Sequence, residues 1–337
     1  MTWHHTERPE LGFADGWSRT LSEMEESGKV HFPDLRRAPT LVVTSDYGGC
    51  HKGSKFETLS FLLAALDQGG EWESKRRLIR QMLLPGGRRM SFKNLNDRHR
   101  RNALASLLDA ANEIPGVVVT FCVSNSLDLA ALGDEAIDRT ESDLAPLHLF
   151  RPSAFRRLVR LSAFVGLFLG GLSAPMQDVL WFSDQDEIVA DEKRIRAATK
   201  VAAQVCAMFA HHPMGHLRFG STRCDDGSRS IEDLAAIPDL AAGAFAEMLM
   251  KAGTGGVPSV DLVMPLPGSL TMKSRYILSW LANQSVPLKK VTCVLSEGNE
   301  PQTLQTRWFH LYTTPAHIQL PHGSPTGYRG SIFGRIP

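Results

Sequence analysis

The sequence predicts an α/β protein in which helices flank both faces of one mixed sheet. Short runs rich in Val, Leu and Phe indicate strands, and longer segments with helical apolar spacing indicate helices. The first three strands are expected to form an antiparallel meander. Later strands alternate with helices, which favours parallel pairing and places helices on both faces.

Each predicted strand is a short apolar run bounded by turn residues. Residues 39–47 are followed by Gly48 and Gly49, and residues 56–66 should pair antiparallel with them, although their Leu/Ala end also suits a helix. Residues 117–123 have the continuous apolar character of a buried strand. The predicted strands are residues 39–47, 56–66, 88–95, 117–123, 179–183, 217–222, 290–295 and 307–312.

Apolar spacing and capping residues define the predicted helices. Asn96 or Asp97 can cap one of them, and Pro238 is expected to break the helix at residues 231–251. Residues 161–176 are the most apolar stretch, but they are too short and Gly-rich for a membrane span of roughly 20 residues. The predicted helices are residues 72–84, 98–112, 153–176, 191–210, 231–251 and 271–282.

The chain divides into three parts on this pattern. Residues 1–38 are polar and predict a loosely packed arm or a short helix, and residues 39–252 form the α/β domain. A Gly/Pro-containing linker opens residues 253–337, a C-terminal extension of uncertain role. This extension could continue the sheet, form a small lobe or make a dimer contact.

Composition limits the function classes. The 43% hydrophobic and 22% charged content is typical of a globular protein, and a net charge of +1 leaves only a local electrostatic argument for nucleic acid. Five scattered cysteines without a C-x-x-C motif disfavour a zinc site and suit a reducing compartment. With no apolar leader and no membrane span, a cytoplasmic location is expected. Walker A, dinucleotide-binding and G-x-S-x-G motifs are absent from the sequence.

Aspartates at strand and helix ends are the candidate functional residues. Asp46 ends the first strand, Asp184 and Asp186 follow the strand at residues 179–183, and Asp239 follows Pro238. Carboxylates that converge at the ends of buried strands could hold a divalent cation. Each also has a structural alternative: a turn residue at Asp46, a cap at Asp184 or Asp186, and a dipole-stabilising helix residue at Asp239.

Four short motifs carry a resemblance to a known family. They are Ser45-Asp-Tyr-Gly-Gly49, Phe92-Lys-Asn-Leu-Asn-Asp-Arg98, Trp181-Phe-Ser-Asp184 and Ile237-Pro-Asp-Leu-Ala-Ala-Gly243. Over roughly residues 39–250 the chain resembles the ribonuclease H-like fold, and within it the family called domain of unknown function 3800. The resemblance implies a divalent-metal-dependent nuclease with Mg²⁺ or Mn²⁺ on Asp46, Asp184 and Asp239, with Asp186 as a further candidate ligand and Lys93 assisting. The same resemblance suggests a role in phage defence or in a mobile element, by analogy alone.

Two departures from the family pattern favour an alternative. Tyr47 stands where the family has Glu, and Ser124 ends a strand where ribonuclease H has an acid; Glu57 is a candidate substitute. These departures suit a catalytically inactive module that binds nucleic acid or a partner protein.

Clustered arginines suggest how nucleic acid would bind. Arg76, Arg77, Arg98 and Arg101 are expected to track a phosphate backbone, whereas the alternative is a set of solvated helix faces. Nucleic acid is therefore the expected partner, with a homodimer or partner protein as further candidates and no membrane contact.

Overall fold

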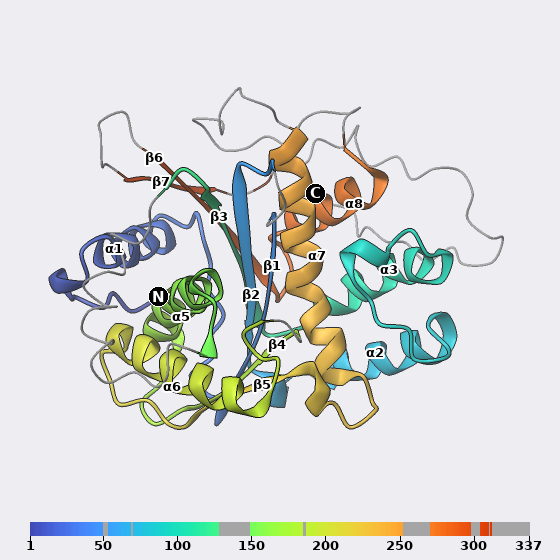
Figure 1. The fold of residues 1–337 in the computed structure, drawn as a ribbon, viewed down its shortest axis with the longest axis horizontal. Helices are drawn as coiled ribbons and strands as arrows, with labels where there is room; N and C mark the ends of the chain where they lie inside the picture. The colour runs from blue at the N-terminus through green and yellow to red at the C-terminus, as the bar shows by residue number, and fades with distance from the viewer. Residues whose placement is uncertain are drawn as a thin grey trace.

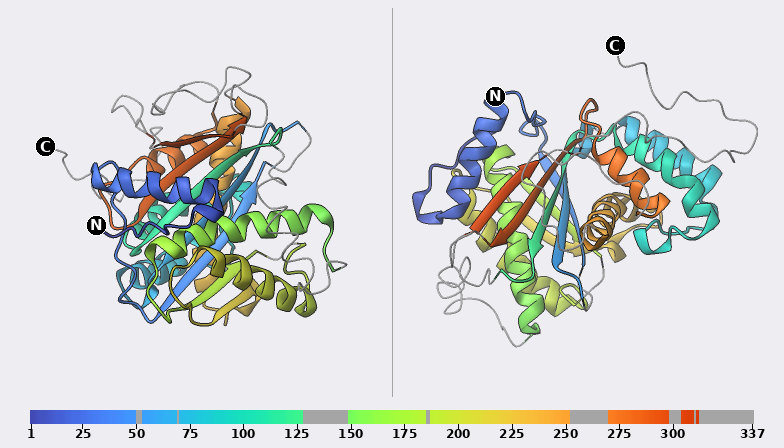
Figure 2. Two further views of the ribbon diagram at one scale, coloured as in Figure 1. Left: turned by 90° about the vertical axis from the view of Figure 1, so that its left-hand side faces the viewer. Right: turned by 90° about the horizontal axis from the view of Figure 1, so that it is seen from above.

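The residues that the structure describes form three layers, a seven-stranded mixed sheet with helices on both faces (Figure 1). The structure is a computed structural model, and it describes residues 1–49, 53–68, 70–127, 149–184, 187–251, 270–297, 304–309 and 311. Seen from above, the sheet is twisted between its two helical layers (Figure 2). The predicted fold class, a mixed α/β sheet flanked by helices, is confirmed at this level.

The strand order explains how distant segments meet. The strands are β1 (Thr40–Gly48), β2 (Phe56–Ala64), β3 (Gly116–Ser124), β4 (Asp178–Ser183), β5 (Leu217–Ser221), β6 (Lys289–Glu297) and β7 (Leu304–Phe309). They lie in the order β5-β4-β1-β2-β3-β6-β7. β1, β2 and β3 are antiparallel, β4 and β5 continue parallel to β1, and β6 pairs parallel with β3 and antiparallel with β7. The described part of residues 253–337 therefore continues the sheet.

Helices cover the two faces unequally. The helices are α1 (Phe13–Glu26), α2 (Gly70–Leu83), α3 (Arg98–Ala111), α5 (Pro152–Leu172), α6 (Glu192–Phe209), α7 (Ser230–Lys251) and α8 (Met272–Leu281). α1, α5 and α6 lie on one face, and α2, α3, α7 and α8 on the other (Figures 1 and 2). None of the helices in the described ranges has the length and apolar character that a membrane span requires.

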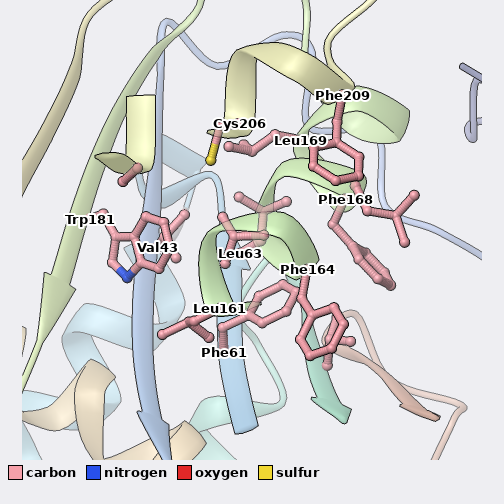
Figure 3. Close-up of a cluster of buried hydrophobic side chains, with 14 of the residues drawn as sticks. Val43, Phe61, Leu63, Leu161, Phe164, Phe168, Leu169, Trp181, Cys206 and Phe209 are labelled. Carbon is pink, nitrogen blue, oxygen red and sulfur yellow. The ribbon is translucent and has the colours of Figure 1, made fainter. Parts of the chain in front are cut away.

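Aromatic side chains fill the core between the sheet and α5 (Figure 3). The rings of Phe121 and Phe164 stack with centroids 3.8 Å apart, and Phe168 meets Phe61 edge-on at 5.5 Å. Trp3 packs against Phe168 at 5.2 Å and is buried. The N-terminal residues are thus part of the core, and the alternative of a loosely packed arm is wrong.

On the opposite face, α7 packs against β1 and β2, and five of its thirteen buried residues are alanines. Pro238 has no N–H, so the carbonyl of Leu234, one turn earlier, loses its helical partner. The hydroxyl of Thr44 on β1 donates to that carbonyl at 3.1 Å. α7 therefore continues through Pro238, and the predicted break there is wrong.

The predicted strand at residues 88–95 is also wrong. Phe92–Asn94 form a 3-10 turn, η3, and β3 is the third antiparallel strand. Met90 and Leu95 are buried by packing among the helices on the α7 face, without joining the sheet.

Candidate functional site

Asp46 and Asp239 meet between β1 and α7. Asp46 is two residues beyond Thr44, so its side chain lies on the same face of the strand as the hydroxyl that holds α7. Asp239 follows Pro238, next to the turn that Thr44 anchors. The two carboxyl groups are hydrogen-bonded to each other. Local features of β1 and α7 thus place two acids in direct contact.

Backbone amides fix each carboxylate. The N–H of Tyr47 donates to Asp46 Oδ1 at 2.6 Å, and the N–H of Phe92 donates to Asp239 Oδ2 at 2.5 Å. Phe92 belongs to η3, so this turn is joined directly to the site. Both carboxylates are held in one orientation by these backbone amides.

The pair is electrostatically strained. Burial raises the pKa of Asp46 well above its ordinary value, and the charges of Asp239 and Asp184 raise it further against the Tyr47 amide. Burial also raises the pKa of Asp239, although the Phe92 amide, the Asp46 hydrogen bond and the Lys93 charge oppose this. Two carboxyl groups in one site favour a single shared proton. A cation bound here would relieve the same repulsion.

Asp184 reaches the same place from the neighbouring strand. β4 runs parallel to β1 with Ser183 opposite Ser45, so Asp46 and Asp184 leave the sheet at the same edge. The charge of Asp184 raises the pKa of both other aspartates. Within the described ranges, no group of three or more His, Cys, Asp or Glu side chains could hold a metal ion as it stands. The three acids are neighbours, and Asp184 is engaged elsewhere.

Asp184 forms an ion pair with Arg89. Arg89 Nη2 lies 2.5 Å from Asp184 Oδ1, and the hydroxyl of Thr222 is 3.4 Å from the same oxygen. Sequence reasoning missed Arg89, because it falls in a segment interpreted as a strand. The only sequence signal was its position three residues before the Phe92 motif.

Lys93 lies beside the pair as predicted, although on the turn η3 rather than on a strand. Its side chain is exposed, and its charge lowers the pKa of Asp239. Lys273 of α8 supports the same turn, since its Nζ donates to the carbonyl of Phe92 at 3.0 Å and lies 4.1 Å from the ring centroid. Two lysines thus flank Phe92 at the site.

Gly243 explains the small-residue end of the Asp239 motif. It lies one turn after Asp239 on the same face of α7, where Phe92 packs. A Cβ at Gly243 would be 2.3 Å from Cγ of Phe92. The glycine therefore allows the ring to lie against the helix while the amide of Phe92 reaches Asp239.

We expect Gly243→Ala to destabilise the protein by about 1–3 kcal/mol, because the methyl group overpacks a filled position. Urea unfolding measures this change. Gly16→Ala is the control: this helical glycine in α1 has nothing within 4 Å of an added Cβ. Gly16→Ala should leave the free energy of unfolding unchanged or raise it by up to about 1 kcal/mol relative to wild type. Equal effects from both substitutions would contradict the role assigned to Gly243.

Several predicted residues lie elsewhere. Asp186 is outside the described residues. Glu57 is on the other face of the sheet, where it pairs with Arg157 at 2.7 Å and Arg160 at 2.5 Å. It therefore does not substitute for a missing acid. The Tyr47 ring also faces α5, with the guanidinium of Arg157 4.3 Å from its centroid.

The four predicted nucleic-acid-binding arginines lie on two helices, two on α2 and two on α3. Arg76 is only 1% exposed and pairs with Glu73 and Asp233, so the prediction that it tracks a phosphate backbone is wrong. Arg77 is exposed and bonded to Glu73 at 2.6 Å. Arg98 and Arg101 are exposed on α3, which begins just after η3. Only these last two are exposed close in sequence to the site.

Comparison of the chain with models of protein families, with curated proteins and with solved structures gives no match. The functional argument therefore depends on the geometry of the site.

Proposed function

We propose that the chain is a divalent-metal-dependent nuclease that cleaves phosphodiester bonds of DNA or RNA. The observation that carries the proposal is the half-buried Asp46–Asp239 carboxyl pair, with Asp184 close enough to raise both pKa values. Such a pair is costly without a compensating cation. Phage defence or a mobile element would be a fitting biological setting, by analogy alone.

The sheet supports a ribonuclease H-like interpretation. That fold, as the sequence resemblance implies it, has three antiparallel strands followed by parallel ones. β1, β2 and β3 are antiparallel, and β4 and β5 continue parallel on the other side of β1. Asp46 and Asp184 stand at the carboxyl ends of two adjacent parallel strands, where α/β proteins place their chemistry.

The donor set fits Mg²⁺ or Mn²⁺, because all three candidate ligands are carboxylates. Asp46, Asp239 and Asp184 would hold the ion, which when bound activates a water and stabilises the leaving oxygen. The amides of Tyr47 and Phe92 orient two of these ligands. Lys93 is placed to offset the charge of a phosphate that approaches Asp239.

Mn²⁺ binding by calorimetry tests the proposal. Wild type should bind Mn²⁺ and cleave nucleic acid, whereas Asp46→Asn should lose detectable binding and about a hundredfold or more of the cleavage rate. Glu192→Gln is the matched control, since this carboxylate is exposed on α6, where it pairs with the exposed Arg196. Wild-type protein that binds no Mn²⁺ would contradict the nuclease proposal.

The second candidate is a catalytically inactive module that binds nucleic acid or a partner protein. The Arg89–Asp184 ion pair favours it, because a guanidinium already neutralises one of the three acids. Nucleic-acid binding without Mn²⁺ binding in the same experiment would support this function.

Substrate contact is tested by the salt dependence of binding. The double variant with Arg98→Glu and Arg101→Glu should bind nucleic acids more weakly than wild type, by about the same factor for every sequence. The slope of log affinity against log salt concentration should fall by about one unit for each phosphate contact that is lost. Arg196→Glu, which changes an exposed arginine of α6 in the other helical layer, should leave the slope unchanged. An unchanged slope in the double variant would exclude α3 from the binding surface.

A further inference from the structure

Of the three acids, Asp184 is the one that forms an ion pair with an arginine, Arg89. Arg89 Nη2 contacts Asp184 at 2.5 Å, and both side chains are about one-third exposed, so solvent and ions reach the pair. The other two acids contact each other and backbone amides. Asp184 is therefore the acid that would have to change partner for all three to hold one ion.

The backbone around Arg89 is fixed from four helices. The carbonyl of Arg88 accepts from Arg80 of α2 at 2.5 Å, and the carbonyl of Arg89 accepts from Arg100 of α3 at 2.6 Å. Phe92 then donates to Asp239 of α7 and accepts from Lys273 of α8. With the backbone held in this way, a change of partner at Arg89 requires movement of its side chain alone.

We propose that Arg89 is a built-in counter-ion that is exchanged between Asp184 and a substrate phosphate. Without ligands it neutralises Asp184, and a divalent cation must displace it. A nucleic-acid phosphate can then accept the freed guanidinium, a geometry for which arginine is well suited. Metal and substrate binding are coupled through this one side chain. The inference rests on the proposed nuclease function and adds its regulation.

The exchange predicts that loss of Arg89 strengthens metal binding. In calorimetry, Arg89→Gln should bind Mn²⁺ roughly three- to tenfold more tightly than wild type, because a partly exposed competing charge is removed. Arg89→Lys keeps the charge and should stay closer to wild type. Arg88→Gln is the matched control, since its side chain pairs with Asp97 instead of Asp184.

The second readout is the effect of substrate on metal affinity. A phosphorothioate oligonucleotide that resists hydrolysis should tighten Mn²⁺ binding at least about threefold more in wild type than in Arg89→Gln, as linkage between two ligands requires. Circular dichroism and the thermal midpoint establish that each variant is folded.

The outcomes separate this inference from the proposed function. If wild type binds Mn²⁺ but Arg89→Gln binds it no more tightly, or if the oligonucleotide affects both proteins equally, the exchange is wrong and the metal site stands. If neither protein binds Mn²⁺, both proposals fall. Binding that appears only in Arg89→Gln would show that a cation does not displace Arg89 from Asp184 in the wild-type protein, and both proposals would fall.

Discussion

Asp233→Ala is expected to destabilise the protein by about 3–5 kcal/mol, the cost of removing one member of a buried ion-pair network. Asp233 is 0% exposed and contacts two arginines of α2, Arg76 at 3.2 Å and Arg80 at 2.8 Å. Arg76 is itself 1% exposed, so water cannot replace the lost carboxylate. Urea unfolding followed by circular dichroism measures the loss.

Glu192→Ala is the control for this prediction. Its partner Arg196 is 73% exposed and Glu192 is 79% exposed, so the loss should be below about 1 kcal/mol. If Asp233→Ala costs no more than this exposed pair, the buried network contributes little to stability.

The same network holds the site in place. Arg80 bonds Asp233 through Nε and the carbonyl of Arg88 through Nη1. Asp233 thus connects the start of α7 with the segment that carries Arg89 and Phe92. We therefore expect Asp233→Ala to weaken the site as well as the fold.

The sequence predicts the elements whose signal is local. The apolar runs of β1, β3 and β4 and the capping signal of Asp97 on α3 all lie within a few residues of the structure they specify. Asp46 and Asp184 were predictable neighbours because parallel strands end at one edge of a sheet.

Features that depend on distant partners were missed. Arg76 resembles a solvated helix residue until Asp233, far along the chain, is placed beside it. Pro238 predicts a break until Thr44 supplies the missing hydrogen bond to α7. Residues 88–95 are predicted as a strand, but Met90 and Leu95 pack among helices instead of joining the sheet. The ion pair of Arg89 with Asp184 joins two separate loops and has no local signature.

The pH dependence of stability tests the electrostatics of the pair without any metal. The folded state raises the pKa of Asp46, first by burial and then by the Asp239 charge, so it binds a proton more tightly than the unfolded chain. The stability that protonated Asp46 contributes to the wild-type fold is therefore fully present below the ordinary Asp pKa. This contribution is lost as the pH rises through the pKa of Asp46 in the folded state.

Asn at position 46 mimics the protonated acid at every pH. Its Oδ1 can accept from the Tyr47 amide, as Asp46 does at 2.6 Å, and its amide group can donate to Asp239. In metal-free buffer, Asp46→Asn should match wild type near pH 3 and become more stable than wild type at pH 7. A difference of about 1 kcal/mol is expected because a half-buried charge next to Asp239 is removed.

Asp178→Asn is the matched control with the opposite sign. The His216 amide lowers the pKa of Asp178, so this group contributes stability above its ordinary pKa and the variant should lose stability toward neutral pH. Thermal midpoints of wild type and both variants from pH 3 to 8 measure the two trends. An Asp46→Asn protein that becomes relatively less stable as pH rises would show that an ionised Asp46 is favourable in the fold, and the cation requirement would lose its physical basis.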